Sequence, residues 1–362
     1  MKSFDIQEYM SGGIARIVKR TLAATVKNPR ESAFVVKYAA ASAKASARRR
    51  SLEEQGTHVP PFLIASITSR CNLHCKGCYS RENHGVEDRA PKNQLTAGEW
   101  GRIFGEAKDL GIGFILLAGG EPMLRRDVLD AAAGVPEIVF PVFTNGVFIT
   151  PQDFARFDAH RNLIPVLSIE GDKAHTDARR GDGIYDRQMQ NMAQMQETGL
   201  FFGASVTVTK ENLELVMSED FVRGLAQTGC GLVIYVEYVP VSAGSEGLAP
   251  DDNDRRHMAA RLESLRSKLP DMLFLSFPGD EHLTGGCLAA GRGFFHISSH
   301  GDAEPCPFSP YSDTNIRDCT LLEALQSGLF RRLQDSGVLL QDHQGGCVLF
   351  AQEQFVRENA GK

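Results

Sequence analysis

The chain has 362 residues, of which 42% are hydrophobic and 23% are charged, and its formal net charge at pH 7 is −6. This length allows a large core and more than one domain, and the composition is ordinary for a globular protein. The negative charge argues against nucleic acid as a partner.

The sequence shows no membrane or secretion signal. No run of about 18 or more apolar residues predicts a transmembrane helix. The first residues, MKSFDIQEYMSGGIARIVKR, lack the apolar region and the cleavage site of a signal peptide. We therefore expect a cytoplasmic protein. In a reducing compartment its eight cysteines indicate metal or redox chemistry before disulfides.

The first zone, residues 1–58, is rich in alanine and in basic residues. Residues 1–50 contain 11 Lys or Arg but only three acidic residues, Asp5, Glu8 and Glu31. Residues 13–28 and 31–55 both have the apolar spacing of amphipathic helices. We interpret this zone as a helical extension that packs on the main domain. The alternative is a basic face that contacts an acidic partner or, peripherally, an anionic membrane.

The second zone, residues 59–278, alternates between strand and helix patterns. Helical patterns separate most of six apolar runs, which cover residues 62–68, 113–119, 137–145, 163–171, 202–209 and 232–241. The helix over 96–111 has a capping box, Thr96 with Glu99, and ends at Gly111. We predict an α/β fold, a partial (β/α)6 TIM-type barrel with its chemistry at the C-terminal strand ends.

Cysteines mark the third zone, residues 279–362. Cys287, Cys306, Cys319 and Cys347 lie among Gly, Pro and short apolar runs. This pattern is typical of a small loop-rich module that metal, rather than a large core, holds together.

Three further cysteines, Cys71, Cys75 and Cys78, follow the first predicted strand with the spacing CxxxCxxC. A structural zinc site normally uses four ligands and closes its coordination shell. Three thiolates without a nearby fourth cysteine instead suit a [4Fe–4S] cluster in which one iron stays open. That iron can bind a small molecule.

The segments CNLHCKGCY, AGGEP, FTNG and LSIEG occur in the order and spacing found in radical S-adenosylmethionine (SAM) enzymes. Over about residues 60–240 the chain resembles the group that includes the molybdopterin, NifB, PQQ and sactipeptide maturases. The resemblance implies that SAM binds the open iron and is cleaved reductively to a 5'-deoxyadenosyl radical, which abstracts hydrogen from a substrate. The chain departs from many members at Gly77, where they carry an aromatic residue.

The resemblance also implies a set of SAM contacts. The turn Gly119, Gly120, Glu121 and Pro122 meets the methionyl ammonium group, and glycine allows close approach. The polar strand ends Thr144, Asn145, Ser168 and Glu170 suit the ribose hydroxyls and the methionyl carboxylate. Arg180, or else Arg179, reaches that carboxylate. The alternative is a polar rim without ligand contact, and Glu237 is either a ligand contact or half of a buried ion pair.

Cys287, Cys306 and Cys347 resemble the auxiliary-cluster module called SPASM, or its shorter form, twitch. The full module has seven cysteines, so four imply one auxiliary [4Fe–4S] cluster rather than two. Cys319 is either its fourth ligand or a spare thiol. We interpret Cys230 as a small buried hydrophobe. We favour structural or surface roles over cluster ligation for His296, His300 and His343.

These motifs do not identify the substrate. We expect maturation of a peptide, a protein side chain or a cofactor, with a flavodoxin or ferredoxin as reductant. The first 58 residues are too short and too helical for the leader-binding domain of many peptide maturases, which weakens the peptide hypothesis. The absence of a preceding B12 domain disfavours a cobalamin-type methyltransferase. The alternative class is a non-catalytic Fe–S protein for electron transfer or redox sensing, whose SAM site has decayed.

Overall fold

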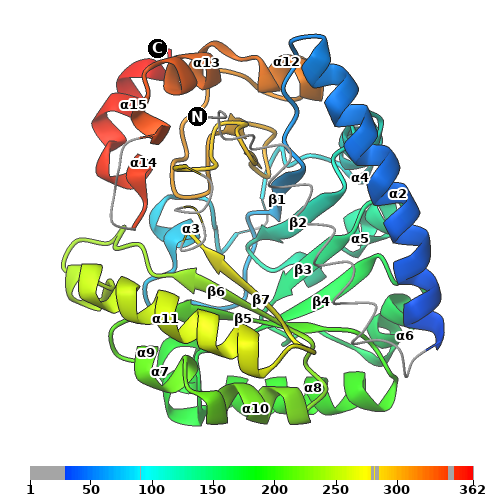
Figure 1. Ribbon diagram of the computed structural model, residues 1–362, viewed down its shortest axis with the longest axis vertical. Coiled ribbons are helices and arrows are strands. Elements are labelled where there is room, and N and C mark those ends of the chain that lie inside the picture. Colours follow the sequence, from blue (N-terminus) through cyan, green and yellow to red (C-terminus); the bar gives the residue numbers. More distant parts are fainter. Residues whose placement is uncertain (1–28, 90, 279–280, 282–284, 341–345, 362) are drawn as a thin grey trace.

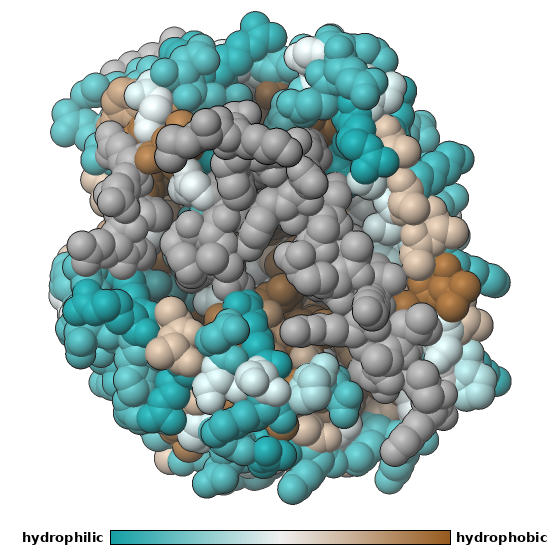
Figure 2. All heavy atoms as spheres, viewed as in Figure 1, coloured by the Kyte–Doolittle hydropathy of each residue, from teal (hydrophilic) through white to brown (hydrophobic). Residues whose placement is uncertain are grey.

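The computed structural model describes residues 29–89, 91–278, 281, 285–340 and 346–361 (Figure 1). The predicted helix over residues 13–28 and the side chain of His343 lie outside these residues. Figure 2 shows hydrophilic side chains over most of the coloured part of one face. No helix in the described part of the chain is long and apolar enough to cross a membrane.

One open, mostly parallel sheet forms the centre of the molecule, with strand order β7-β6-β5-β4-β3-β2-β1-β8-β9. The six predicted strands are all present, as β1 (Phe62–Thr68), β2 (Phe114–Gly119), β3 (Phe140–Thr144), β4 (Leu163–Ser168), β5 (Gly203–Val208) and β6 (Leu232–Glu237). Three more extend the sheet, namely β7 (Leu273–Phe277), β8 (His296–Ile297) and β9 (Ala303–Glu304). The sheet is an unclosed barrel, which confirms the predicted fold class.

Many of the helices cover the outside of this sheet, while those after residue 320 lie along one end of the molecule (Figure 1). In chain order they are α2 (Pro29–Glu54), α3 (Tyr79–Glu82), α4 (Ala97–Leu110), α5 (Arg126–Ala133), α6 (Pro151–Ala159), α7 (Lys173–Arg180), α8 (Ile184–Glu197), α9 (Leu213–Val216), α10 (Glu219–Gln227), α11 (Asp252–Lys268), α12 (Leu321–Leu325), α13 (Gly328–Asp335), α14 (Val348–Ala351) and α15 (Glu353–Asn359). Short 3-10 turns are η1 (Pro122–Leu124), η2 (Glu246–Leu248) and η4 (Val338–Leu340).

The predicted capping box is formed at the start of α4. Thr96 accepts a hydrogen bond from the Glu99 amide (3.2 Å), and the Glu99 carboxylate accepts one from the Thr96 amide (2.6 Å). The helix ends at Gly111, which adopts the left-handed conformation (φ 88°) that suits glycine. The inner face of α4 is apolar and fully buried, because Trp100 and Phe104 stack there on one another. The Phe104 ring also packs edge-on against Phe140 of β3, at 5.0 Å between centroids, and this contact fastens the helix to the sheet.

Helix α2 packs on the barrel, as we favoured for the N-terminal zone. The Tyr38 hydroxyl donates to the Gly113 carbonyl (2.8 Å), and the buried Arg49 guanidinium donates to the Gly111 carbonyl. At the other end, the buried Glu31 carboxylate pairs with Arg161. These side chains fasten α2 to the loops around α4 and the sheet.

The C-terminal zone joins the sheet directly. Strand β8 pairs in parallel with β1, with His296 beside Ile64, and β9 pairs antiparallel with β8. On the outside, the Leu321 amide at the start of α12 donates to Glu106 of α4 (2.7 Å). One hydrophobic core continues across residues 58 and 278, where we place the domain boundaries. These boundaries stay a prediction.

Tyr38→Phe tests how α2 is fastened. We expect it to lower the free energy of unfolding by about 1 kcal/mol, because the Gly113 carbonyl loses one of its donors. Val36→Ala is the control, because Val36 is 57% exposed on the same helix and should change stability by less than about 0.5 kcal/mol. Urea denaturation measures both. Equal effects of the two substitutions would contradict the account.

Candidate functional site

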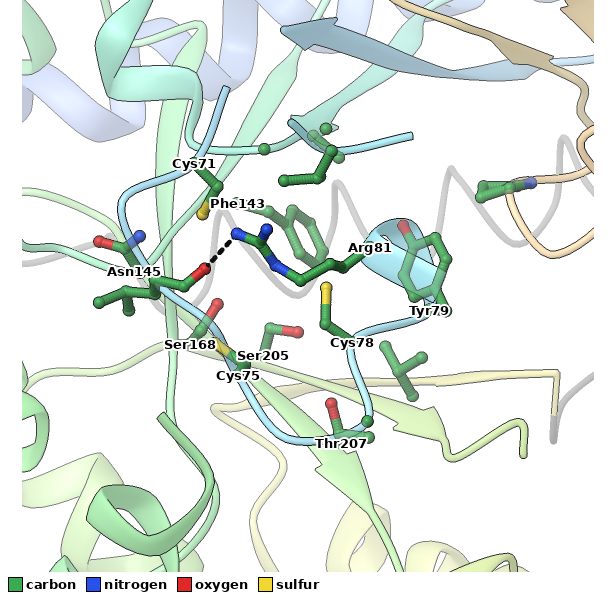
Figure 3. Close-up of a pocket in the computed structure, with 18 of the residues that line it drawn as sticks. Cys71, Cys75, Cys78, Tyr79, Arg81, Phe143, Asn145, Ser168, Ser205 and Thr207 are labelled. Carbon is green, nitrogen blue, oxygen red and sulfur yellow. Dashed lines mark hydrogen bonds between the residues drawn. The ribbon is translucent and has the colours of Figure 1, made fainter. Parts of the chain in front are cut away.

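A pocket of about 210 Å³ opens at the C-terminal ends of the strands. Figure 3 shows Cys71, Cys75 and Cys78 around it, together with polar side chains from the strand ends. Its other lining residues include Ile64, Leu116, Phe143, Val236 and Phe277 from the sheet, and Pro307 and Phe308 from the C-terminal zone. The pocket therefore lies where a barrel of this class places its chemistry.

The three cysteines fit an iron–sulfur cluster. All three are free thiols that line the same pocket. Burial raises the pKa of Cys71 to about 11, while a hydrogen bond from the Leu73 amide favours its thiolate. A guanidinium nitrogen of Arg180 lies 4.0 Å from the Cys75 sulfur. These donors suit thiolates that metal binding has deprotonated.

Among the described residues, no three His, Cys, Asp or Glu side chains converge as a single metal ion would require. A cubane cluster needs a wider arrangement, because each thiolate binds a different iron. Three thiols around one pocket meet that need and leave one iron without a cysteine.

The GGEP turn fastens the cysteine loop to the sheet. The Gly120 amide donates to the Thr68 carbonyl (2.7 Å), and the Glu121 amide donates to the Arg70 carbonyl (2.8 Å). A Cβ atom on Gly119 would lie 2.3 Å from the Thr68 oxygen, and one on Gly120 would lie 2.1 Å from the Arg70 oxygen. Only glycine permits this approach. The two glycines therefore set the path of the chain just before Cys71.

Glu121 lines the pocket, but its carboxylate faces the protein. It accepts hydrogen bonds from the Thr144 hydroxyl (2.6 Å), the Asn145 amide (2.8 Å) and the Met123 amide (3.0 Å). Burial raises its pKa. Asn145 in turn donates its side-chain amide to Asn72 in the cysteine loop (2.9 Å). Glu121 and Asn145 thus tie the ends of β2 and β3 to that loop, while Pro122 begins the turn η1.

Glu170 holds two arginines in place. Its carboxylate accepts from Arg179 (2.5 Å), from Arg180 (2.7 Å) and from the Thr207 amide (3.1 Å), and it is 1% exposed. Both arginines line the pocket, as does Ser168. The Lys76 amide of the cysteine loop donates to the Arg179 carbonyl (2.8 Å). The predicted contacts of Ser168 and Arg180 with SAM stay predictions, and Glu170 acts here as an anchor.

Glu237 is half of a buried ion pair, one of the two roles we considered. Its carboxylate lies 2.7 Å from the Arg255 guanidinium, and it is 3% exposed. It also lines the pocket.

No motif in the sequence predicts the contact between Tyr238 and Gly77. A Cβ atom on Gly77 would lie 2.5 Å from the Tyr238 hydroxyl, so the tyrosine ring occupies the space that a side chain here would need. Tyr238 lines the pocket, and its buried hydroxyl has no hydrogen-bond partner among the described residues. The fold thus brings an aromatic ring from the end of β6 to the residue before Cys78. Gly77 and Tyr238 are about 160 residues apart in the sequence, so only the folded chain shows that they are in contact.

The C-terminal cysteines divide into three and one. Cys287 and Cys306 are buried and Cys347 is half-buried. Cys347 lies close enough to disfavour the thiolates of both Cys287 and Cys306, and burial raises the pKa of Cys347 to about 12. Cys319 lies elsewhere. It precedes Thr320, the N-cap of α12, whereas Cys347 directly precedes α14 on the opposite side (Figure 1). Its thiol donates to the Asn315 carbonyl (3.4 Å).

Of the two roles that we left open for Cys319, this position favours the spare thiol over the fourth ligand, and its role stays a prediction. Its charged neighbours are Glu323 and, on α4, Arg102 and Glu106 rather than the other three cysteines. Cys230 is a buried thiol that donates to the Leu232 carbonyl (3.2 Å), as expected of a small hydrophobe. The ring nitrogens of His296 contact Ser66 (2.7 Å) and Glu304 (2.6 Å), which is a structural role.

Gly120→Ala tests whether the turn shapes the cysteine loop. The added methyl group clashes with the Arg70 carbonyl, so we expect the loop to shift and the iron bound by Cys71, Cys75 and Cys78 to fall severalfold. Gly105→Ala is the matched control, since its Cβ atom meets nothing within 4 Å. Iron analysis after anaerobic reconstitution measures the effect. Full iron content in Gly120→Ala would contradict it.

Sequence comparison finds the radical SAM superfamily over residues 65–222. The chain is 27% identical over 313 residues to the AdoMet-dependent heme synthase of Methanosarcina barkeri, covering 77% of this chain and 86% of that protein. It is also 27% identical over 275 residues to the mycofactocin maturase MftC of Mycolicibacterium smegmatis, covering 71% and 66%.

Among solved structures, SuiB of Streptococcus suis bound to S-adenosylmethionine superposes with a TM-score of 0.68. The identity is 20%, and the match covers 86% of this chain and 79% of SuiB, so it shows a shared fold. The sequence match spans the cysteine loop, the GGEP turn and the strand ends around the pocket. The chain therefore carries a radical SAM domain over residues 65–222.

Proposed function

We propose that this protein is a radical SAM maturase in which Cys71, Cys75 and Cys78 hold the [4Fe–4S] cluster that binds SAM. The observation that carries the proposal is the convergence of these three thiols on the one pocket that the GGEP turn and the strand ends also line. When bound, the cluster and SAM supply a 5'-deoxyadenosyl radical that abstracts hydrogen from the substrate.

The chain's own residues orient SAM by charge and hydrogen bonding. Arg179 and Arg180 present two guanidinium groups to the pocket, and Glu170 fixes both. We assign the methionyl carboxylate to this cationic side, with Arg180 as the contact. Ser168 and Asn145 line the neighbouring wall and suit the polar groups of SAM. Tyr238 offers a buried hydroxyl on the side of Gly77.

Apolar side chains also line the pocket, and we assign to them the exclusion of water from the reacting atoms. They are Phe143, Val236 and Phe277, together with Phe308 from the C-terminal zone. The Tyr79 and Phe308 rings pack at 4.6 Å between centroids and join the two cysteine regions. An apolar lining protects a radical from side reactions with solvent.

Cys287, Cys306 and Cys347 hold an auxiliary cluster in this proposal. Pro307 and Phe308 follow Cys306 directly and line the pocket, so the auxiliary site adjoins the substrate space. A flavodoxin or ferredoxin supplies the electron for SAM cleavage. The intact cysteine loop and turn favour this enzyme over a redox protein with a decayed SAM site.

The substrate class follows from the relatives, and we propose a peptide. MftC and the PqqA peptide cyclase of Granulibacter bethesdensis, at 25% identity over 262 residues, are named for peptide or peptide-derived products. The second candidate is a tetrapyrrole, because the heme synthase of Methanosarcina barkeri matches over a larger share of its length. Incubation with each class, with SAM and reductant, separates them by the mass change of the product.

SAM cleavage tests the enzyme activity. We expect the anaerobically reconstituted, reduced protein to convert SAM to 5'-deoxyadenosine and methionine, which mass spectrometry detects. The triple variant Cys71→Ala, Cys75→Ala, Cys78→Ala should make none, because the cluster that binds SAM is lost. Cys319→Ala is the control and should keep the activity. Undiminished product from the triple variant would show that the assignment is wrong.

Iron content tests the second site. We expect Cys306→Ala to bind about four irons fewer than the wild-type chain, because one cubane is lost. Cys319→Ala should bind the wild-type amount. An equal loss in both variants would contradict the division of the C-terminal cysteines into three and one.

A further inference from the structure

The C-terminal site has three cysteines for a cluster that normally takes four protein ligands. Since Cys319 lies beside α4, it leaves the fourth place unfilled. The question is which other side chain faces Cys287, Cys306 and Cys347. This inference rests on the proposed function, because it assumes that these three thiols bind an auxiliary cluster.

Among the described residues, Glu281 faces them. It follows β7, where its amide donates to the Pro278 carbonyl (2.8 Å), and it is only 4% exposed. One carboxylate oxygen accepts from the Leu288 amide (3.3 Å), directly after Cys287. The carboxylate also receives a hydrogen bond from the Cys287 thiol. Its negative charge disfavours the thiolates of Cys306 and Cys347 as well.

This position is costly for a carboxylate. Only 4% of Glu281 is exposed, and the nearby Glu237 carries a second negative charge. Arg292 offsets part of this negative charge, while it donates to the Cys287 carbonyl. Buried carboxylates persist in proteins where they are paired or where they bind metal. A buried acidic side chain that faces three thiols is therefore explained best by a metal centre that all four share.

We propose that the Glu281 carboxylate is the fourth protein ligand of the C-terminal iron–sulfur site. A carboxylate carries the same single negative charge as a thiolate, so it leaves the total charge of the ligand set unchanged. Its oxygen is a harder donor than sulfur, and the iron that it binds differs from the three held by cysteine.

Residues of the substrate pocket adjoin this site. Glu237 lines the pocket and interacts with the charges of both Glu281 and Cys347. Its partner Arg255 packs against Gly346, since a Cβ atom there would lie 2.9 Å from the guanidinium. Glu281 would therefore hold its metal close to the pocket that Glu237 lines.

The experiment uses the full chain with Cys71, Cys75 and Cys78 changed to alanine, so that only the C-terminal cluster remains. Glu281→Gln, Glu281→Cys and the exposed control Glu263→Gln are made in this parent. Each protein is reconstituted anaerobically and reduced with dithionite, and its iron content and EPR spectrum are recorded with and without cyanide. Cyanide probes for an iron without a protein ligand.

We expect Glu281→Gln to shift the EPR spectrum and to make it respond to cyanide, because one iron has lost its ligand. Glu281→Cys should bind about four irons and resist cyanide, with the spectrum of a cluster held by four cysteines. Glu263→Gln should match the parent. A Glu281→Gln protein with the parent's iron content, spectrum and lack of cyanide response would overturn the proposal.

The triple-alanine parent also distinguishes the Glu281 proposal from the proposed auxiliary cluster on which it rests. If the parent binds no iron, or if a further Cys306→Ala change leaves its iron content unaltered, the proposal of an auxiliary cluster is wrong. The proposed role of Glu281 is then wrong as well. If the parent binds iron through Cys306 but already responds to cyanide, the cluster stands and Glu281 is not its ligand. SAM cleavage by the wild-type chain is unaffected by either result.

Discussion

Two backbone hydrogen bonds hold this site together. They join Gly120 to Thr68 and Glu121 to Arg70, at the point where β2 ends beside β1. They form only because Gly119 and Gly120 have no side chain. Through them the loop that carries the three cysteines leaves the sheet in one direction, and Glu121 extends the same network to the end of β3. The positions of the three cysteines in the pocket therefore depend on the backbone of the GGEP turn.

Around that frame the pocket separates its charges. Glu170 draws Arg179 and Arg180 together at one wall, and Glu237 does the same for Arg255 near the C-terminal cysteines. Each buried carboxylate thus neutralises guanidinium charge while fixing its position, which a lone arginine at a loop would not achieve. The pocket thus has charged and polar groups that are held in place, which in our proposal bind SAM. It also has apolar side chains, among them Phe308, which in our proposal surround the reacting atoms.

Local signals carried most of the prediction. The six strands, the capping box at Thr96 and the cysteine spacing are readable because each depends on neighbours in the sequence. Strands β8 and β9 have two residues each and show no periodicity, so their place beside β1 was not predictable. Three features of the site depend on contacts between distant segments. These are the separation of Cys319 from the other C-terminal cysteines, the approach of Glu281 to those cysteines, and the contact of Tyr238 with Gly77. Spacing alone does not distinguish these alternatives.

The central claim is that Cys71, Cys75 and Cys78 leave one iron open for SAM. The most direct measurement is EPR of the reduced chain in which Cys287, Cys306 and Cys347 are alanine, so that only this cluster contributes. Addition of SAM should change the spectrum, with saturation at about one SAM per chain. A spectrum that stays constant at saturating SAM, with the cluster intact, would contradict the account.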